Sequence, residues 1–178
     1  GALKQGYSQD LAEQVFALIE PFAGYAFNKA HAVSYGLISY WTAYLKTNFP
    51  IEYMVCLLNT YMGNTEKITS AVAECRRLRI PVHPPDINRS QAEFSIETDD
   101  DGRQAIRFGL AAVKNVGAVA LRPILESRQK EGPFSSIEHM CRVADVGSLN
   151  RKTLESLIKV GAFDRFSDRG ALLSVLGR

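Results

Sequence analysis

The chain has 178 residues, of which 46% are hydrophobic and 22% charged, and its formal net charge is +2. This length and composition are ordinary for a globular protein with a genuine core, and they exclude disorder as the default. No apolar run approaches the roughly 20 residues needed to span a bilayer, and no basic and then apolar leader opens the chain. We therefore expect a soluble, cytoplasmic protein without a membrane partner. Because Gly1 stands where an initiator Met would, we also expect an excised piece of a longer protein.

The three cysteines, Cys56, Cys75 and Cys141, are far apart and lie among apolar helical positions. No C-x-x-C pair or Cys/His cluster has the spacing of a zinc site, and His83 and His139 have no partners at metal spacing. The sequence predicts buried free thiols in a reducing compartment and no metal site made by this chain alone.

Charge is distributed unevenly along the chain. Residues 83–102 carry one Lys or Arg against six Asp and Glu, whereas residues 103–178 carry thirteen against seven. A positive excess attracts polyanions but does not by itself identify nucleic acid as the partner.

Two helices are expected in the first 50 residues. Ser8 can cap the first, which should run to about Ala23. The second, from Phe27 to Pro50, is predicted to be long and buried, because its apolar residues recur at steps of three and four. Those residues are Val33, Leu37, Tyr40, Trp41 and Tyr44.

The start of this second helix is a candidate anion site. Asn28 is a good N-cap residue, and Lys29 and His31 follow in the opening turn, where unpaired backbone N–H groups create a positive end. The alternative is a core helix whose Lys and His only cap and solvate one end.

Two more helices should follow, from Ile51 to Met62 and from Asn64 or Thr65 to about residue 79. Arg76, Arg77 and Arg79 crowd the end of the last one. Cations there suit the helix dipole, an interpretation that we favour over direct DNA contact.

The proline-rich passage from Pro81 to Pro85 cannot be helical and predicts a boundary between parts 1–82 and 83–178. Beyond it, residues 93–97 and 103–108 alternate as the two strands of a β-hairpin. The aspartates at 99–101 could suggest a metal site, but Asp before Gly is what turn geometry favours, and a loop tip holds carboxylates too loosely for two metal ions.

Residues 110–130 resemble a helix-hairpin-helix motif, with a tight turn at Asn115, Val116 and Gly117. A Gly or Asn in such a turn lets backbone N–H groups at the start of the second helix approach a DNA phosphate. Lys114 and Arg122 add positive charge. Residues 103–130 contain six basic residues and one acid, which fits binding of the duplex backbone without reading bases. Asn replaces the usual first glycine of the motif, and Pro123 should bend or shorten the second helix.

A second helical pair is expected where Ser135 or Ser136 caps one short helix and Asn150 caps another. Arg151 and Lys152 occupy the first turn of the latter, where they oppose the helix dipole, and this suggests that they serve a phosphate partner. A last helix should run from Arg169 to Leu176.

Several motifs in this order resemble bacterial replicative DNA polymerases of the C family, the DNA polymerase III alpha subunits. The first is Gly24-Tyr25-x-Phe27-Asn28-Lys29-x-His31-Ala32 before an aromatic-rich helix, which is similar to their fingers domain. The likeness continues through PxEYM (50–54), NTEK (64–67), PPDIN (84–88), RFGL (107–110), LNRK (149–152) and GAFD (161–164).

The resemblance implies a mainly α fold, with a helical fingers subdomain (1–82) followed by a small β-hairpin and a tandem helix-hairpin-helix region that binds duplex DNA (83–178). It implies that Asn28, Lys29 and His31 contact the incoming nucleotide or template. It implies that residues 114–117 (Lys114, Asn115, Val116, Gly117), Arg122, Arg151 and Lys152 contact the DNA backbone.

For the whole enzyme, the resemblance implies a DNA-directed DNA polymerase that extends primer-template DNA with deoxynucleoside triphosphates and Mg²⁺. The catalytic aspartates and the contacts to the sliding clamp and other holoenzyme subunits would lie outside this chain, which alone should be inactive. Three alternatives stay open: a non-enzymatic helix-hairpin-helix module of a repair or recombination protein, an error-prone alpha-subunit paralogue, and a helical protein-interaction scaffold.

Overall fold

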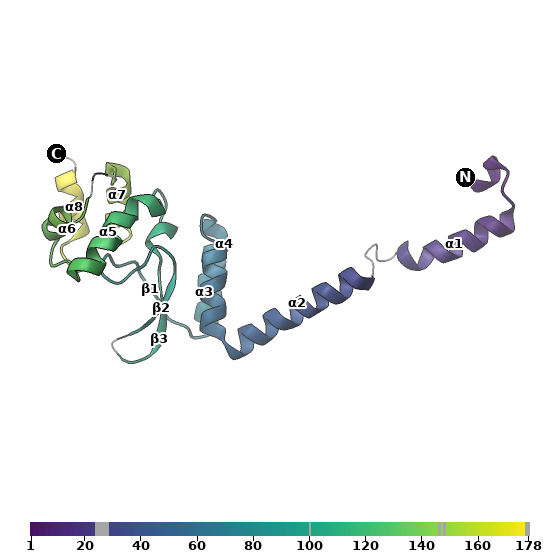
Figure 1. Cartoon of the computed structure of the whole chain (residues 1–178), viewed down its shortest axis with the longest axis horizontal. Helices are drawn as coiled ribbons and strands as arrows, with labels where there is room; N and C mark the ends of the chain where they lie inside the picture. The colour runs from purple at the N-terminus through teal and green to yellow at the C-terminus, as the bar shows by residue number, and fades with distance from the viewer. Residues whose placement is uncertain (24–28, 100, 146, 148, 177–178) are drawn as a thin grey trace. The chain divides into compact units, whose positions relative to one another are not determined.

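The computed structural model of the protein describes residues 1–23, 29–99, 101–145, 147 and 149–176. The predicted fold class is confirmed, because the described chain is mainly helical with one small sheet (Figure 1). No helix in this described part is both long and apolar enough to cross a membrane. The helical elements are η1 (Ala2–Gln5), α1 (Gln9–Ala23), α2 (Lys29–Asn48), α3 (Pro50–Thr60), α4 (Thr65–Arg77), η2 (Leu110–Ala112), α5 (Ala118–Glu131), α6 (Ile137–Val143), α7 (Arg151–Lys159) and α8 (Arg169–Leu176). The strands are β1 (Val82–His83), β2 (Ser95–Thr98) and β3 (Gln104–Arg107).

The chain divides into two compact units, Gly1–Leu45 and Lys46–Arg178. The first contains α1 and most of α2. Ser8 caps α1 as predicted, because its hydroxyl accepts a hydrogen bond from the backbone N–H of Leu11 at 3.3 Å. The boundary predicted between residues 82 and 83 lies inside the second unit and stays a prediction.

The apolar face of α2 differs from its prediction. The helix forms where expected, but Val33, Tyr40 and Trp41 are 62%, 64% and 54% exposed, and Leu37 and Tyr44 are exposed as well. The predicted burial of this face is therefore wrong for the described chain. A helical period determines which residues share a face, but it does not determine what packs against that face.

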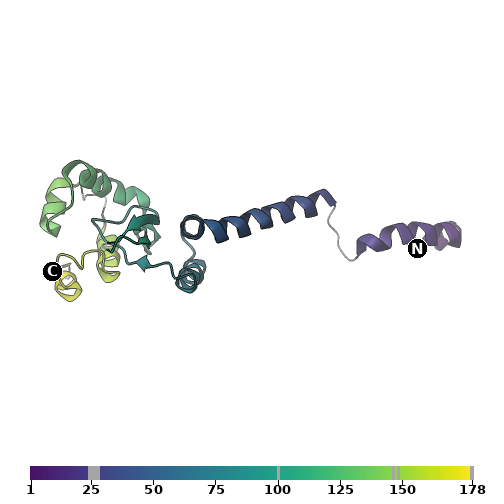
Figure 2. The ribbon, with the colours of Figure 1, turned by 90° about the horizontal axis from the view of Figure 1, so that it is seen from below.

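In the second unit, α3 and α4 lie side by side (Figures 1 and 2) and form one core with the sheet. Pro50 occupies the first turn of α3, and Asn64 caps α4 by accepting from the backbone N–H of Lys67. The Asn59 side chain on α3 both donates to and accepts from the backbone of Phe94, at 3.0 and 2.8 Å. These bonds fix the chain entering β2 against α3.

The predicted β-hairpin is confirmed, since β2 pairs with β3 in antiparallel register, with Ile96 opposite Ile106. Asp99 has the predicted turn role, because its carboxylate accepts from the backbone N–H groups of Asp101 and Arg103. The short strand β1 was not predicted. It pairs with β3 in parallel, with Val82 opposite Ile106, and completes the sheet order β1-β3-β2.

A second core lies among the C-terminal helices, with Leu121, Ile124 and Phe163 fully buried. Phe108 packs against both cores and joins them. The backbone N–H of Ile87 donates to the Ala162 carbonyl at 2.9 Å, so the PPDIN and GAFD segments meet in the fold.

Burial of the cysteines is confirmed only for Cys75, where the apolar surroundings raise the thiol pKa to about 11. Cys56 and Cys141 are exposed. All three are free thiols, and apolar neighbours in the sequence did not indicate which side of the helix each would occupy.

Candidate nucleic-acid interface

The first hairpin (residues 110–131) has the predicted order of a short helix, a tight turn and a longer helix. Its first helix is a 3₁₀ helix, and the N–H of Val116 donates to the Val113 carbonyl at 3.1 Å to close the turn. Asn115 has a φ of +67°, in the left-handed region that Asn tolerates better than most residues. Pro123 does not interrupt α5, which runs unbroken from Ala118 to Glu131, so the expected shortening does not occur and the expected bend stays a prediction.

The start of α5 is open. Gly117 provides no side-chain cap, and no described group accepts from the N–H groups of Ala118 and Val119, both of which are exposed. A Cβ added to Gly117 would meet no atom within 4 Å, and its φ of −91° suits any residue. The fold itself therefore does not require glycine at position 117. Glycine is needed here only if an outside group, such as an anion, comes close to the backbone N–H groups.

The second hairpin (residues 137–159) touches this turn. Asn150 caps α7 as predicted by accepting from the N–H of Thr153 at 2.9 Å. Thr153 is 2% exposed, and its hydroxyl donates to the Asn115 carbonyl at 2.9 Å. The Asn115 side-chain amide in turn donates to the Ser156 hydroxyl at 3.2 Å. The two hairpins are thus joined where both helices begin.

This junction brings together candidate residues that the sequence placed in separate motifs. Lys114 and Asn115 lie on one side of it, and Arg151 and Lys152 directly precede Thr153 on the other; all four are exposed. Neither α5 nor α7 carries an acidic residue in its first turn. Cations beside two helix N-termini repel the dipoles and one another, so the arrangement favours an anion between them.

Sequence reasoning did not identify Thr153 or Ser156. A hydroxyl at the third position of a helix usually bonds within its own helix. For Thr153, only the tertiary contact to Asn115 reveals another role. No pattern in the sequence indicates that its partner lies 38 residues away.

We expect Thr153→Val to loosen the junction while keeping the side-chain shape. Losing one hydrogen bond should lower the free energy of unfolding by about 1 kcal/mol. Duplex affinity, measured by fluorescence anisotropy, should fall about two- to five-fold, because the two helix starts are no longer held in register. The control Thr69→Val, which removes only an exposed bond to the Thr65 carbonyl within α4, should leave both quantities unchanged.

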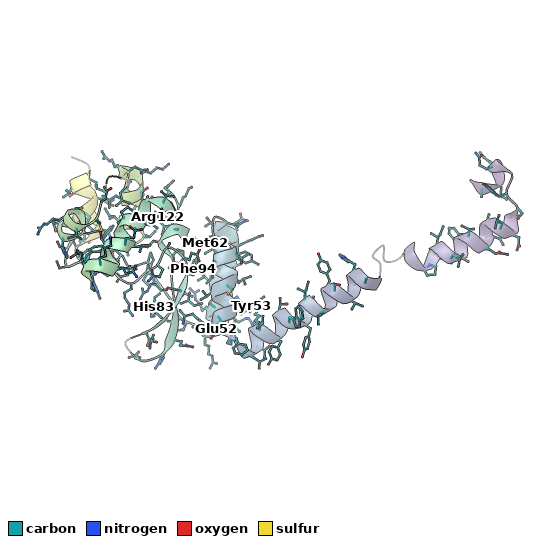
Figure 3. The ribbon with its side chains drawn as sticks, in the orientation of Figure 1. Glu52, Tyr53, Met62, His83, Phe94 and Arg122 are labelled. Carbon is teal, nitrogen blue, oxygen red and sulfur yellow. The ribbon has the colours of Figure 1, made fainter. Side chains whose placement is uncertain are left out.

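Arg122 lies further along α5 (Figure 3) and lines a groove of about 570 Å³ with Gln91 and Ala92. It is exposed and can reach an anion on that side of the helix. Within the described ranges, no hydrogen bond or ion pair links it to the Asn115–Thr153 junction, so the structure does not group it with Lys114.

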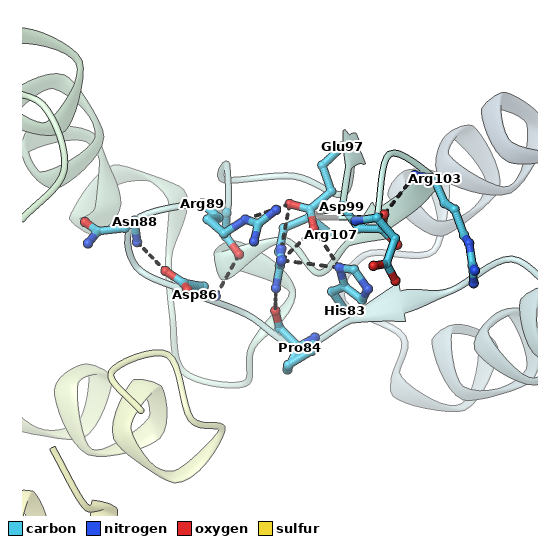
Figure 4. Close-up of polar contacts among 11 residues, drawn as sticks. His83, Pro84, Asp86, Asn88, Arg89, Glu97, Asp99, Arg103 and Arg107 are labelled. Carbon is cyan, nitrogen blue, oxygen red and sulfur yellow. Dashed lines mark hydrogen bonds and ion pairs between the residues drawn. The ribbon is translucent and has the colours of Figure 1, made fainter. Parts of the chain in front are cut away.

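Two of the six basic residues counted between 103 and 130 form hydrogen bonds with other groups of the protein. Fewer cations are therefore available to DNA than the sequence count implied. Arg128 donates to the carbonyls of Ile87 and Ser90 at 2.8 and 2.7 Å, and burial lowers the pKa of its guanidinium. Arg107, 5% exposed, donates to both Glu97 oxygens, at 2.9 and 2.5 Å, and to the Pro84 carbonyl at 2.6 Å (Figure 4). Both residues hold loops in place.

Glu97 is the centre of that cluster. His83 Nδ1 lies 2.7 Å from one Glu97 oxygen, and Arg89 lies 3.4 Å from the other. Burial raises the pKa of Glu97, but the hydrogen bonds from Arg107 and His83 outweigh it, and the pKa ends below its ordinary value.

The predicted nucleotide or template residues are only partly described. Asn28 and the Lys29 side chain lie outside the described residues. His31 is half-buried in the first turns of α2 and its ring centroid lies 4.3 Å from that of Tyr35. Within the described ranges, no group of three His, Cys, Asp or Glu residues could hold a metal ion.

Comparison with known proteins supports the hairpin interpretation. The helix-hairpin-helix motif family matches residues 79–172, which is more than half of the chain. The DNA polymerase III subunit alpha of Thermus aquaticus is 43% identical over 176 residues, covering 99% of this chain and 14% of the relative. Its Escherichia coli K12 counterpart is 43% identical over 178 residues, covering 99% and 15%. The Campylobacter jejuni protein is 46% identical over 166 residues, covering 93% and 14%.

The chain spans about a seventh of the length of these relatives. Similarity reaches both units, and the resemblance to DNA polymerase III alpha subunits that the motifs indicated is confirmed. On the match over residues 79–172, the chain belongs to the helix-hairpin-helix motif family.

Proposed function

We propose that this chain is a segment of a bacterial DNA polymerase III alpha subunit and that its second unit binds the backbone of duplex DNA. One observation carries the proposal: Thr153 joins the two hairpins so that an uncapped helix start, Lys114, Arg151 and Lys152 lie around one junction. Phosphates are the part of DNA that such donors recognise.

The binding is independent of base sequence. Val116 at the turn is buried, and Gly117 and Ala118 present backbone N–H groups without a polar side chain that could reach base edges. Lys114, Arg151, Lys152 and Arg122 supply charge, which raises affinity for every duplex alike.

In the whole protein, the proposed activity is template-directed DNA synthesis from deoxynucleoside triphosphates on primer-template DNA. Mg²⁺ would be held by carboxylates outside this chain, and contacts to the sliding clamp and other subunits would also lie elsewhere. Asn28, Lys29 and His31 would stabilise the charge of the incoming nucleotide or contact the template. The segment alone has no polymerase activity in this proposal.

A non-enzymatic repair or recombination module is less well supported. Such a module needs only the hairpins, whereas the similarity to the alpha subunits covers 99% of the chain and therefore includes α1 to α4. An error-prone paralogue would share most of these features, and the Asn28-Lys29 pair favours the replicative branch.

Changing Lys114 and Arg122 together to Ala should weaken duplex binding about ten-fold, since each phosphate contact contributes modestly. The reduction should be equal for duplexes of different sequence, as anisotropy titrations can measure. The double variant Lys130→Ala/Arg142→Ala, which removes the same charge from exposed positions away from the helix starts, serves as control. Equal losses in both variants would contradict a localised site.

Changing Lys29 to Ala in the full-length enzyme should slow single-nucleotide addition about ten-fold or more while leaving DNA affinity nearly unchanged. Rapid-quench kinetics and anisotropy on the same preparation separate the two effects. A wild-type rate of addition would remove Lys29 from the nucleotide site.

A further inference from the structure

Helix α4 ends in a Schellman motif that has arginine at its left-handed position. The N–H of Ile80 donates to the Cys75 carbonyl at 2.9 Å and the N–H of Arg79 donates to the Arg76 carbonyl at 3.1 Å. Arg79 has a φ of +59°. Glycine is the usual residue here, because a Cβ is disfavoured in this conformation.

The same chain contains the same motif with glycine. At the end of α7, Ala162 donates to the Leu157 carbonyl at 3.0 Å and Gly161 to the Ile158 carbonyl at 2.9 Å, with φ of +87° at Gly161. Five described positions with positive φ are glycines, and the other exception, Asn115, is of a type that tolerates the region. Arginine at position 79 therefore has a conformational cost that the turn itself does not require.

The helix dipole does not account for Arg79. It favours cations in the last turn, where Arg76 and Arg77 already lie, and Arg77 forms two hydrogen bonds with Glu74 at 2.7 and 2.6 Å. Arg76 and Arg79 are exposed, and no residue in the described ranges pairs with either guanidinium. Among the three arginines at the end of α4, these two are therefore the ones without an ion-pair partner in the described part of the chain.

A groove with four aliphatic side chains in its lining lies beside Arg76, and Arg79 directly precedes one of them, Ile80. Val72, Ile80, Pro81 and Val82 line about 160 Å³ of space together with Arg76. Apart from Arg76, the side chains that line it are aliphatic. Single-stranded nucleic acid is bound on aromatic side chains, and duplex DNA, which is held through its phosphates, would leave the aliphatic side chains uncovered. The lining therefore does not favour nucleic acid as the ligand. Thr65 at the start of α4 lines a hollow with Lys114, and Arg76 lies 11 residues further along the helix, roughly 16 Å away.

We propose that Arg76, Arg79 and this groove bind an acidic segment of a partner protein, with one aliphatic side chain in the groove and carboxylates on the two arginines. Charge complementarity selects the acidic segment, and the aliphatic walls select its apolar residue. In this proposal, Arg79 makes this contact at the expense of a better helix end.

The test uses the 178-residue chain and a fluorescein-labelled peptide, EEDLDEE, at low salt. Arg76→Gln and Arg79→Gly should each lower peptide affinity about three-fold, as loss of an exposed ion pair does. Arg142→Gln, which removes an exposed cation from the last turn of α6, should not. The peptide EEDSDEE should bind more weakly than EEDLDEE. Arg79→Gly should also raise Tm by about 2–4 °C, because glycine relieves the left-handed strain.

Three results would overturn the proposal. One is that the peptide does not bind, or that it binds Arg76→Gln and Arg79→Gly as tightly as it binds the unchanged chain. Another is that Arg79→Gly lowers Tm, since then the arginine stabilises the turn itself. The third is that the two variants lose duplex affinity by the same factor as peptide affinity, which would assign the arginines to the nucleic-acid surface.

Discussion

Replacing Arg107 with Met is expected to lower the free energy of unfolding by about 3 kcal/mol, the lower end of the range for breaking a buried ion pair. Met fills similar space, but Glu97 loses two hydrogen bonds and the Pro84 carbonyl loses its donor. Glu97 is 14% exposed and keeps His83 and Arg89, which limits the loss. Thermal unfolding should show Tm lower by about 6–12 °C.

Arg103→Met is the matched control, because this exposed arginine contacts Asp99 through its backbone groups (Figure 4), and no described residue pairs with its guanidinium. Its Tm should change little.

The pKa of Glu97 is lowered in the folded state, so the carboxylate stabilises the protein above its unfolded pKa and loses this effect as the pH falls through the folded pKa. The difference in the free energy of unfolding between wild type and Arg107→Met should therefore be largest at pH 7 and should shrink below about pH 4. A difference that does not change with pH would contradict the ion-pair explanation.

Gly109→Ala is expected to destabilise the protein by about 2–4 kcal/mol, because the added Cβ cannot be accommodated by a side-chain movement. It would lie 2.5 Å from the carbonyl carbon of Glu93, 2.7 Å from the nitrogen of Phe94 and 2.8 Å from the carbonyl oxygen of Ala92. The segment before β2 that carries those atoms accepts hydrogen bonds from the backbone N–H groups of Leu110 and Ala111 through the carbonyls of Gln91 and Ala92, at 3.0 and 2.9 Å. Chemical denaturation measures the loss.

The control is Gly117→Ala in the first hairpin, which directly follows Gly109; here an added Cβ meets no atom within 4 Å. This change should cost at most about 1 kcal/mol, from a poorer helix cap. Duplex affinity should show the opposite order. Relative to its small loss of stability, Gly117→Ala should lose more duplex affinity than Gly109→Ala, because the methyl group keeps phosphate away from the backbone. If Gly109→Ala were as stable as Gly117→Ala, this would contradict the close packing of Gly109 against the backbone of residues 92–94.

Local features of the fold were predictable because their causes lie within a few residues. Ser8, Asn64, Ser136 and Asn150 cap helices where the sequence placed them, and the Asp99 turn closes the hairpin. Strand β1 was not predictable, because it is two residues long, adjoins prolines and exists only through pairing with β3. The exposed face of α2 was misjudged for a related reason, since periodicity says nothing about a partner surface.

The candidate site shows the same division. The left-handed turn at Asn115 and the open start of α5 follow from residue types in one short segment. Arg107 and Arg128 carry the same charge in the sequence as Lys114, yet tertiary contacts make them internal clamps. Counting charges therefore overestimated the DNA-binding surface, and the contact from Thr153 to Asn115 that joins the hairpins could only be found in the fold.

The salt dependence of duplex affinity tests the central claim most directly. For the 178-residue chain, a plot of log affinity against log salt concentration should fall steeply. Changing Lys114, Arg151 and Lys152 together to Ala should make its slope shallower by about 2–3, near 0.9 for each phosphate that is no longer neutralised. Slopes that are equal for the wild-type and triple-variant chains, or a wild-type chain that does not bind duplex at low salt, would contradict a phosphate-binding junction between the two hairpins.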